Sequence, residues 1–269
     1  MKLATLGPPG TFSHEAALRL DPKAEIVFQR TIRDVFEYTA GDPGYSGLVP
    51  LENSVSGSVG ETLDALTDSE LQIEKELIHP VIQHLAGISG SQQIITILAH
   101  PQSYAQCEKY IRGNYPDAEI IQTSSNGKSA EMLQESRRKD WAAIVPELAV
   151  KLYKLKMIHQ GIQDNRYNVT RFVQISHNPT SSTGYDRTSL AIYPQVDYPG
   201  LLHEMLGHFS SRGVNLSKIE SRPSKGRLGD YIFFIDVQGH QKDERVAEAL
   251  EVLKKMAFIK VLGSYPRQY

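Results

Sequence analysis

Short apolar runs alternate with amphipathic segments through roughly the first 175 residues of the chain. Apolar runs typical of buried strands occupy residues 3–6, 26–29, 46–50, 94–99, 119–122, 142–145 and 172–175. Segments with a helical spacing of apolar residues occupy 12–20, 33–39, 60–66, 102–111, 128–135 and 147–152. This alternation predicts α/β units with mostly parallel sheets.

A long extended stretch over residues 71–88 interrupts this rhythm. We expect it to carry the chain from one lobe to a second, and a segment near 160–171 to return. The predicted lobes are residues 1–74 together with 163–178, and residues 75–162. Two lobes joined by two crossings create a cleft, which is a usual place for a small-molecule site.

The pattern changes after a polar linker at residues 178–184. Strands are predicted at 188–193, 214–221, 231–237 and 258–262, helices at 201–209 and 246–253, and a Gly-rich turn at 226–229. The order βαββαβ predicts a ferredoxin-like domain over residues 185–269. We expect one side of its sheet to be exposed, which favours association into oligomers.

Composition and charge argue against several classes of protein, including nucleic-acid-binding and membrane-spanning proteins. The 269 residues are 40% hydrophobic and 22% charged, with a net charge of −2, so nothing attracts nucleic acid electrostatically. No apolar run reaches the roughly 18 residues of a membrane span. One cysteine, Cys107, excludes an internal disulfide, and the first residues lack a signal-peptide pattern, so we expect a cytoplasmic protein. No cysteine pair or paired histidines suggest a metal site.

The segment Asn168-Val169-Thr170-Arg171-Phe172 places an amide, a hydroxyl and a guanidinium at the start of a predicted strand. The hydroxyl of Thr170 can donate a hydrogen bond to a departing oxygen. The guanidinium of Arg171 either binds a substrate carboxylate through two parallel hydrogen bonds or holds the lobes together. The sequence does not separate these two roles.

Three further polar clusters lie at predicted strand-to-helix junctions, over residues 7–13, 52–58 and 100–107. The first lacks the Gly-Lys of a phosphate-binding loop, so we reject nucleotide binding there. We expect a helix capped by Thr11 or Ser13 instead. In the second cluster, Ser58 and Glu61 have the spacing of a capping box.

In this order, the clusters resemble the prephenate dehydratase family over almost the whole chain. The matching segments are Gly7-Pro8-Pro9-Gly10-Thr11-Phe12-Ser13, Pro50-Leu51-Glu52-Asn53-Ser54 with Gly57-Ser58-Val59, His100-Pro101-Gln102 with Gln106-Cys107, Ile162-Gln163-Asp164 with Asn168, and Thr170-Arg171-Phe172. The tail resembles an ACT domain through Pro199-Gly200-Leu201-Leu202 and Glu220-Ser221-Arg222-Pro223. The chain departs from the family at Ala99, where a serine is common, and in its Ser124-Ser125-Asn126-Gly127 segment.

The resemblance implies a periplasmic-binding-protein-like catalytic domain over residues 1–178, an ACT domain over 185–269, and a homodimer or homotetramer. It also implies conversion of prephenate to phenylpyruvate, water and carbon dioxide, with feedback by phenylalanine. Because formation of an aromatic ring drives this reaction, no cofactor is expected. Two alternatives stay open, an arogenate dehydratase and a non-catalytic sensor of amino acids or carboxylates.

The resemblance and the chemistry of the substrate together assign roles to individual residues. The expected catalytic residues are Thr170, as donor to the departing hydroxyl, with Asn53, Ser54 and Gln106. The expected substrate-binding residues are Thr11, Ser13, Glu52, His100, Gln102, Arg171 and Phe172. The expected phenylalanine-binding residues are Pro199, Gly200, Leu201, Leu202, Asn215, Leu216, Glu220, Ser221, Arg222 and Pro223. No metal ligand is assigned.

Overall fold

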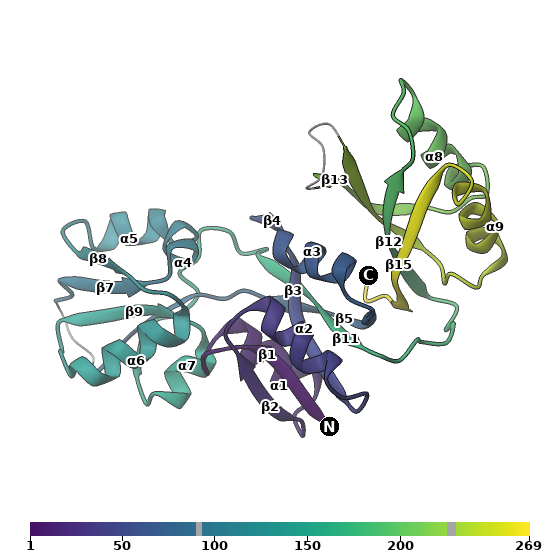
Figure 1. Ribbon diagram of the computed structural model, residues 1–269. Coiled ribbons are helices and arrows are strands. Elements are labelled where there is room, and N and C mark those ends of the chain that lie inside the picture. Colours follow the sequence, from purple (N-terminus) through teal and green to yellow (C-terminus); the bar gives the residue numbers. More distant parts are fainter. Residues whose placement is uncertain (90–92, 225–229) are drawn as a thin grey trace.

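The computed structural model describes residues 1–89, 93–224 and 230–269. The chain forms two α/β lobes and a separate C-terminal domain, each built on one sheet (Figure 1). This confirms the fold class predicted from the sequence. The glycine-rich turn predicted at 226–229 lies outside the described residues.

The first lobe contains both the beginning of the chain and its return segment. Its 6-stranded sheet has the order β2-β1-β3-β11-β5, with β4 paired to β3. The strands are β1 (Lys2–Leu6), β2 (Glu25–Gln29), β3 (Tyr45–Asn53), β4 (Gly57–Ser58), β5 (Gln72–Pro80) and β11 (Val169–Ser176), and the helices are α1 (Phe12–Leu20), α2 (Ile32–Ala40) and α3 (Gly60–Asp68). Thr11 caps α1 as predicted, its hydroxyl accepting from the His14 N–H.

The second lobe is a 5-stranded sheet of order β10-β6-β9-β7-β8. Its strands are β6 (His84–Gly87), β7 (Thr96–Ala99), β8 (Glu119–Gln122), β9 (Trp141–Val145) and β10 (Lys156–His159), and its helices are α4 (Pro101–Ala105), α5 (Glu108–Asn114), α6 (Asn126–Ser136) and α7 (Glu147–Leu152). β7 pairs in parallel with β8 and β9, as the alternation of strands and helices predicts.

The C-terminal domain has the predicted βαββαβ order and a 4-stranded sheet, β13-β14-β12-β15. Its elements are β12 (Asp186–Pro194), α8 (Leu201–Ser210), β13 (Leu216–Pro223), β14 (Tyr231–Gln238), α9 (Glu244–Leu253) and β15 (Ala257–Pro266). Gly200, just before α8, has a φ of +96°, a left-handed conformation that glycine adopts without strain.

The first crossing between the lobes lies later than the predicted boundary at 74/75. β5 runs to Pro80 and pairs antiparallel with β11 in the first sheet, where His79 lies opposite Thr170. The chain therefore enters the second lobe only between Pro80 and His84. The long extended stretch over residues 71–88 concealed this boundary because it contains one strand of each lobe, β5 and β6.

The helix predicted over 102–111 is divided into α4 and α5. The reason is tertiary, because the Gln106 carbonyl accepts from the backbone N–H of Asp164. The Asp164 carboxylate then accepts from the N–H groups of Lys109 and Tyr110 and caps α5 from a distant segment. The predicted capping box is also wrong, since Ser58 Oγ lies 2.5 Å from Lys218 Nζ and α3 has no side-chain cap.

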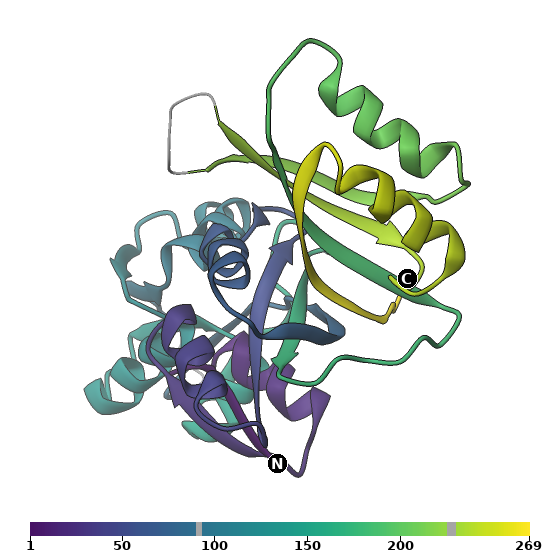
Figure 2. The ribbon, with the colours of Figure 1, turned by 45° about the vertical axis from the view of Figure 1, so that its right-hand side comes forward.

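The expected exposed side of the sheet in the C-terminal domain is confined largely to β13, where alternate residues, Ile219 among them, are exposed. One side packs on α8 and α9, and the opposite side packs on the first lobe (Figure 2). There Phe234 and Leu262 belong to the same apolar cluster as Leu66 and Ile73. The first lobe thus covers part of the sheet of the C-terminal domain.

β15 approaches the first lobe most closely at Gly263. A Cβ atom at this position would lie 2.4 Å from the Ile73 carbonyl oxygen, and the φ of +154° is unfavourable for other residues. The β12–β15 register also shifts at this point, as a bulge does. Glycine is therefore required for this contact between the domains.

We predict that Gly263→Ala lowers the free energy of unfolding by about 1–3 kcal/mol, the usual cost of inserting atoms into a packed interface. Urea unfolding followed by circular dichroism measures the change. Gly113→Ala is the control, because a Cβ there meets nothing within 4 Å. Equal stability of the two variants would show that β15 does not need this close approach.

Candidate active site

A cavity of about 560 Å³ lies between the two lobes. Its lining from the first lobe includes Leu6, Gly7, Thr11, Phe12, Ser13, Arg30, Ile32, Pro50, Asn53, Val59, Glu61, Thr170 and Phe172. The second lobe and the crossing before it contribute Val81, Gln83, His100, Gln102, Ser103, Gln106, Ser124, Ser125 and Asn126. Polar clusters that are far apart in the sequence therefore meet around one space, which we call the cleft.

Thr170 lines the lobe-1 side of the cleft. The register of β11 places it between Asn53 of β3 and His79 of β5. Asn53 Nδ2 donates to Thr170 Oγ1 over 3.0 Å. Asn53 Oδ1 accepts from two backbone N–H groups, those of Val55 and Ser56, so the orientation of this carboxamide is fixed.

The proton of Thr170 is left available by this arrangement. Its oxygen accepts from Asn53, and the hydroxyl donates to no acceptor in the described part of the chain. A hydroxyl that accepts a hydrogen bond also becomes a stronger donor. The side chain of Thr170 can therefore donate to a molecule bound in the cleft.

Asn168, which the sequence placed in the same motif, supports Asn53. Its Oδ1 accepts from Asn53 Nδ2 over 2.7 Å. Its Nδ2 is buried and has no partner among the described residues. Because Asn53 Nδ2 also lies 3.1 Å from the Val169 carbonyl, three oxygen atoms surround this one amide nitrogen.

The lobe-2 side of the cleft is a chain of amides around one hydroxyl. Gln83 Nε2 lies 3.1 Å from Ser103 Oγ and 3.0 Å from Gln106 Oε1. Asn126 Nδ2 donates to Ser103 Oγ over 2.8 Å. Gln106 was predicted, whereas Gln83, Ser103 and Asn126 were not, because only the fold brings their segments together.

Side chains also connect the lobes across the cleft. Gln102 Nε2 donates to Ser56 Oγ over 2.9 Å. Glu15 on α1 accepts from the Leu148 N–H at the start of α7, and its second oxygen lies 3.2 Å from His79 Nε2. The two lobes therefore meet through contacts that must break if the cleft opens.

The charged groups in the cleft lie on the lobe-1 side. Arg30 and Glu61 both line it and are exposed to solvent, and sequence reasoning assigned neither of them to the site. On the lobe-2 side, burial lowers the pKa of His100, so its ring is neutral at neutral pH. In the described part of the chain, no group of three potential metal ligands among His, Cys, Asp and Glu comes together.

The cleft includes eight of the predicted site residues, Thr170, Asn53, Gln106, Thr11, Ser13, His100, Gln102 and Phe172. Glu52, Ser54 and Arg171 instead line a separate cavity on the other face of the sheet. The difference follows from strand alternation, since neighbours of Thr170 and Asn53 in β11 and β3 point to the opposite face. The Ser54 hydroxyl accepts a hydrogen bond from the Val169 N–H and donates one to the Tyr167 carbonyl.

The Arg171 guanidinium lies outside the cleft, and its contacts are with residues of the fold. Its Nε donates to Glu76 over 2.8 Å, Nη1 to Asp236 over 2.5 Å and Nη2 to Tyr265 over 2.6 Å. Burial alone would lower the pKa of this guanidinium, but Tyr265, Asp236 and Glu76 raise it well above its usual value. All three nitrogen atoms are therefore used within the fold, and two partners belong to the C-terminal domain.

Ala99, where the family often has serine, is fully buried and is not part of the cleft lining. Ser103, four residues further along, supplies a hydroxyl to the cleft from α4. The Ser124-Ser125-Asn126-Gly127 segment, the other departure, also reaches the cleft through its first three residues. A Cβ at Gly127 would lie 2.4 Å from the Pro9 carbonyl, so glycine permits this approach between lobes.

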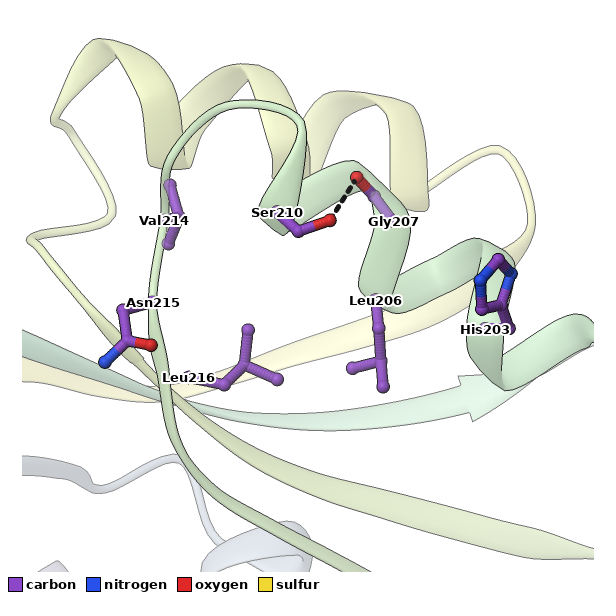
Figure 3. Close-up of a pocket in the computed structure, with 7 residues that line it drawn as sticks. All are labelled: His203, Leu206, Gly207, Ser210, Val214, Asn215 and Leu216. Carbon is purple, nitrogen blue, oxygen red and sulfur yellow. Dashed lines mark hydrogen bonds between the residues drawn. The ribbon is translucent and has the colours of Figure 1, made fainter.

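A second cavity of about 320 Å³ lies in the C-terminal domain between α8 and β13 (Figure 3). It is lined by His203, Leu206, Gly207, Ser210, Val214, Asn215 and Leu216. Asn215 and Leu216 were predicted as effector residues, whereas Pro199, Gly200, Leu201 and Leu202 lie at the start of α8, outside this lining.

The second predicted effector segment, Glu220-Ser221-Arg222-Pro223, lies on β13 near the first lobe. Glu220 pairs with Lys218, and Arg222 lies 3.5 Å from Asp64 of α3. Neither side chain lines the cavity beside α8. The structure therefore separates the two predicted effector segments, one near the cavity and one at the contact between domains.

Comparison with known proteins agrees with this geometry. The family profiles described as Prephenate dehydratase and ACT domain match residues 3–180 and 195–255. The bifunctional chorismate mutase/prephenate dehydratase of Aquifex aeolicus is 39% identical over 99% of this chain and 74% of its own length. The crystal structure of prephenate dehydratase from Arthrobacter aurescens in complex with L-Phe has a TM-score of 0.91 at 35% identity, covering 99% of this chain and 90% of that one.

A further solved structure is GqqA, described as a novel type of quorum quenching acylase. It has a TM-score of 0.89 at 27% identity and covers 100% of this chain and 98% of its own. The family profile and the Aquifex relative, together with a cleft built from the predicted motifs, settle the classification. The chain belongs to the prephenate dehydratase family.

Proposed function

We propose that the cleft between the lobes carries out the decarboxylating dehydration of prephenate, with Thr170 as the hydrogen-bond donor to the departing hydroxyl. The observation that carries this assignment is the Asn53 Nδ2–Thr170 Oγ1 hydrogen bond. It fills one acceptor position of Thr170 Oγ1, and the hydroxyl proton has no acceptor in the described part of the chain.

The reaction requires two bonds to break in one alignment. The bond between the ring and its carboxylate breaks, and its electron pair enters the ring. The bond between the opposite ring carbon and the hydroxyl breaks, and the oxygen leaves with its electron pair and takes up a proton to become water. Aromatisation supplies the driving force, so the site must mainly orient the substrate and stabilise the leaving oxygen.

Thr170 is suited to the second task. A threonine hydroxyl is a weak acid, so we propose that it donates a strong hydrogen bond as charge develops on the oxygen. The donation from Asn53 polarises the hydroxyl, and Asn168 fixes Asn53 in turn. The proton that completes the water comes in the end from solvent.

Arg30 replaces Arg171 as our proposed anchor for the side-chain carboxylate of prephenate. It is the cation in the described lining of the cleft, which also includes the hydroxyl groups of Thr11 and Ser13. A positive charge there binds the part of the substrate that survives the reaction, so its attraction does not oppose the chemical step. His100, Gln102 and Phe172 remain proposed substrate contacts, and Gln106 remains a proposed catalytic residue.

We predict that Thr170→Val lowers kcat by about a hundred- to a thousand-fold, since loss of one donor to a developing oxyanion costs about 2.7–4 kcal/mol. An ultraviolet assay of phenylpyruvate formation from prephenate measures it. The matched control is Thr5→Val, which removes a buried threonine hydroxyl of β1 that bonds the Leu48 carbonyl outside the cleft. A Thr170→Val enzyme that turns over like Thr5→Val would eliminate the proposed role.

We propose that phenylalanine binds as effector in the cavity beside α8. Support comes from the Arthrobacter relative, whose structure is a complex with L-Phe. Leu206, Val214 and Leu216 offer apolar contacts for a benzyl group, and Asn215 has both a donor and an acceptor for the amino-acid end. Association into a homodimer or homotetramer, and a cytoplasmic location, remain parts of this proposal.

The route from this cavity to the cleft passes through Arg171. Asp236 and Tyr265 of the C-terminal domain hold its guanidinium, and Thr170 is the preceding residue of β11. We propose that phenylalanine favours one arrangement of this junction over another, because a ligand shifts an equilibrium only through different affinities for its two states.

We predict that Gly207→Leu lowers the affinity for phenylalanine at least tenfold by filling the cavity. A Cβ at Gly207 meets nothing within 4 Å, so the new side chain has room and helix α8 tolerates it. Titration calorimetry measures binding, and Gly113→Leu on α5 is the control with the same chemical change in another open helix position. Unaltered binding to Gly207→Leu would place the effector elsewhere.

The alternative substrate arogenate carries an ammonium in its side chain. Glu52, a predicted substrate-binding carboxylate, lies outside the cleft, whereas Glu61 lines it. Turnover of prephenate and arogenate by one preparation separates these two activities, and no turnover of either would favour a sensor. Acyl transfer commonly uses a hydroxyl activated by a hydrogen-bonded base. Among the described residues, no hydroxyl of the cleft is hydrogen-bonded to His100, so the cleft offers no such pair with this histidine for an activity like that of the acylase GqqA.

A further inference from the structure

Ser103 has a hydrogen-bonding pattern that the proposed reaction has not used. It belongs to α4, is 3% exposed and lines the cleft on the lobe-2 side. A serine hydroxyl can accept two hydrogen bonds and donate one. Gln83 Nε2 and Asn126 Nδ2 supply the two that it accepts. In the described part of the chain, its proton has no acceptor.

The orientations of the Asn126 and Gln83 carboxamides support the assignment of Ser103 as the acceptor in both hydrogen bonds. Asn126 Nδ2 also lies 3.3 Å from the Ile144 carbonyl, so the nitrogen and not the oxygen faces Ser103. Gln83 presents its nitrogen to both Ser103 Oγ and Gln106 Oε1, and its own oxygen is buried with no partner among the described residues. With these orientations both acceptor positions of Ser103 are filled, and its hydroxyl is left to donate outward.

Thr170 and Ser103 are thus a matched pair on opposite lobes. Each is a buried hydroxyl whose oxygen accepts from carboxamides and whose proton is available to a ligand. The two groups that prephenate loses, the hydroxyl and the carboxylate, are attached to opposite carbons of its ring. A ring that spans the cleft presents one of these groups to each lobe.

We propose that Ser103 is a substrate-binding residue that donates a hydrogen bond to the ring carboxylate of prephenate, the group that leaves as carbon dioxide. This inference rests on the proposed position of the departing hydroxyl at Thr170. Ser103 takes no part in bond breaking, and its effect is to hold the carboxylate on the side of the ring opposite the leaving oxygen.

The character of the lobe-2 wall favours the departing carboxylate over the one that remains. The wall offers the amides of Gln83, Gln106 and Asn126 and a neutral His100, while Arg30 lies on the lobe-1 side. Negative charge leaves this carboxylate as carbon dioxide forms. A cation would stabilise the starting state more than the transition state, whereas a neutral donor orients the group at a smaller cost.

The test compares substrate with product. We expect Ser103→Ala to lower kcat/KM for prephenate about ten- to a hundred-fold, the range for a hydrogen bond to a charged group. Phenylpyruvate has lost the ring carboxylate, so its inhibition constant should stay within about twofold of the wild-type value. Ser46→Ala is the control, because Ser46 is a buried serine of the first lobe that accepts from Gln174 Nε2 outside the cleft.

Two results would overturn the proposal. One is an unchanged kcat/KM for prephenate in a folded Ser103→Ala enzyme. The other is an equal weakening of prephenate and phenylpyruvate, which would mean that Ser103 only shapes the wall or contacts the side chain. If the alanine variant does not fold, Ser103→Cys keeps the volume and replaces a strong donor by a weak one, and the same comparison applies.

Thr170→Val, assayed beside these variants, keeps the two proposals apart. A lowered kcat in Thr170→Val, together with an unchanged kcat/KM in Ser103→Ala, would overturn only the role of Ser103. Normal turnover in Thr170→Val would overturn the donor role of Thr170, and with it the orientation of the ring on which the role of Ser103 depends.

Discussion

The buried guanidinium of Arg171 is the interaction on which the arrangement of the domains depends. It holds Glu76 of the first lobe and Asp236 of the C-terminal domain, while Arg187 adds a second positive charge on Glu76. Two cations and two carboxylates balance in the interior, which limits the cost of burying them. Removal of a single partner leaves a charge unpaired, so the C-terminal domain is part of the support for strand β11.

Strand alternation makes this junction relevant to chemistry. Thr170 and Arg171 are consecutive, so one points into the cleft and the other toward the C-terminal domain. The same strand therefore positions a hydroxyl against the substrate and receives the contacts of a regulatory domain. In the proposed coupling, a shift of β11 that repacks Arg171 would also move Thr170, the preceding residue, relative to Asn53.

Much of this architecture can be predicted from the sequence, because apolar residues recur with the spacing of helices or form the short runs of buried strands. The alternation of apolar runs and helical patterns located most helices and strands. The strand-to-helix clusters led to Asn53 and Gln106 in the cleft, and the polar segment 168–172 at a strand start led to Thr170. The failures are tertiary. Asp164, which is distant in the sequence, caps α5 and so ends the helix that was predicted to be continuous. Lys218 donates to the Ser58 hydroxyl that was expected to cap α3. The residues around Ser103 come from segments that no local sequence pattern connects.

The most direct test of the account is phenylalanine inhibition of the Asp236→Asn enzyme. The amide keeps the shape of the side chain but removes the charge that Arg171 contacts from the C-terminal domain. The account predicts that calorimetry still detects phenylalanine binding, while saturating phenylalanine inhibits turnover much less than in the wild type. Full inhibition of that variant would contradict the claim that Arg171 links the regulatory domain to the catalytic strand.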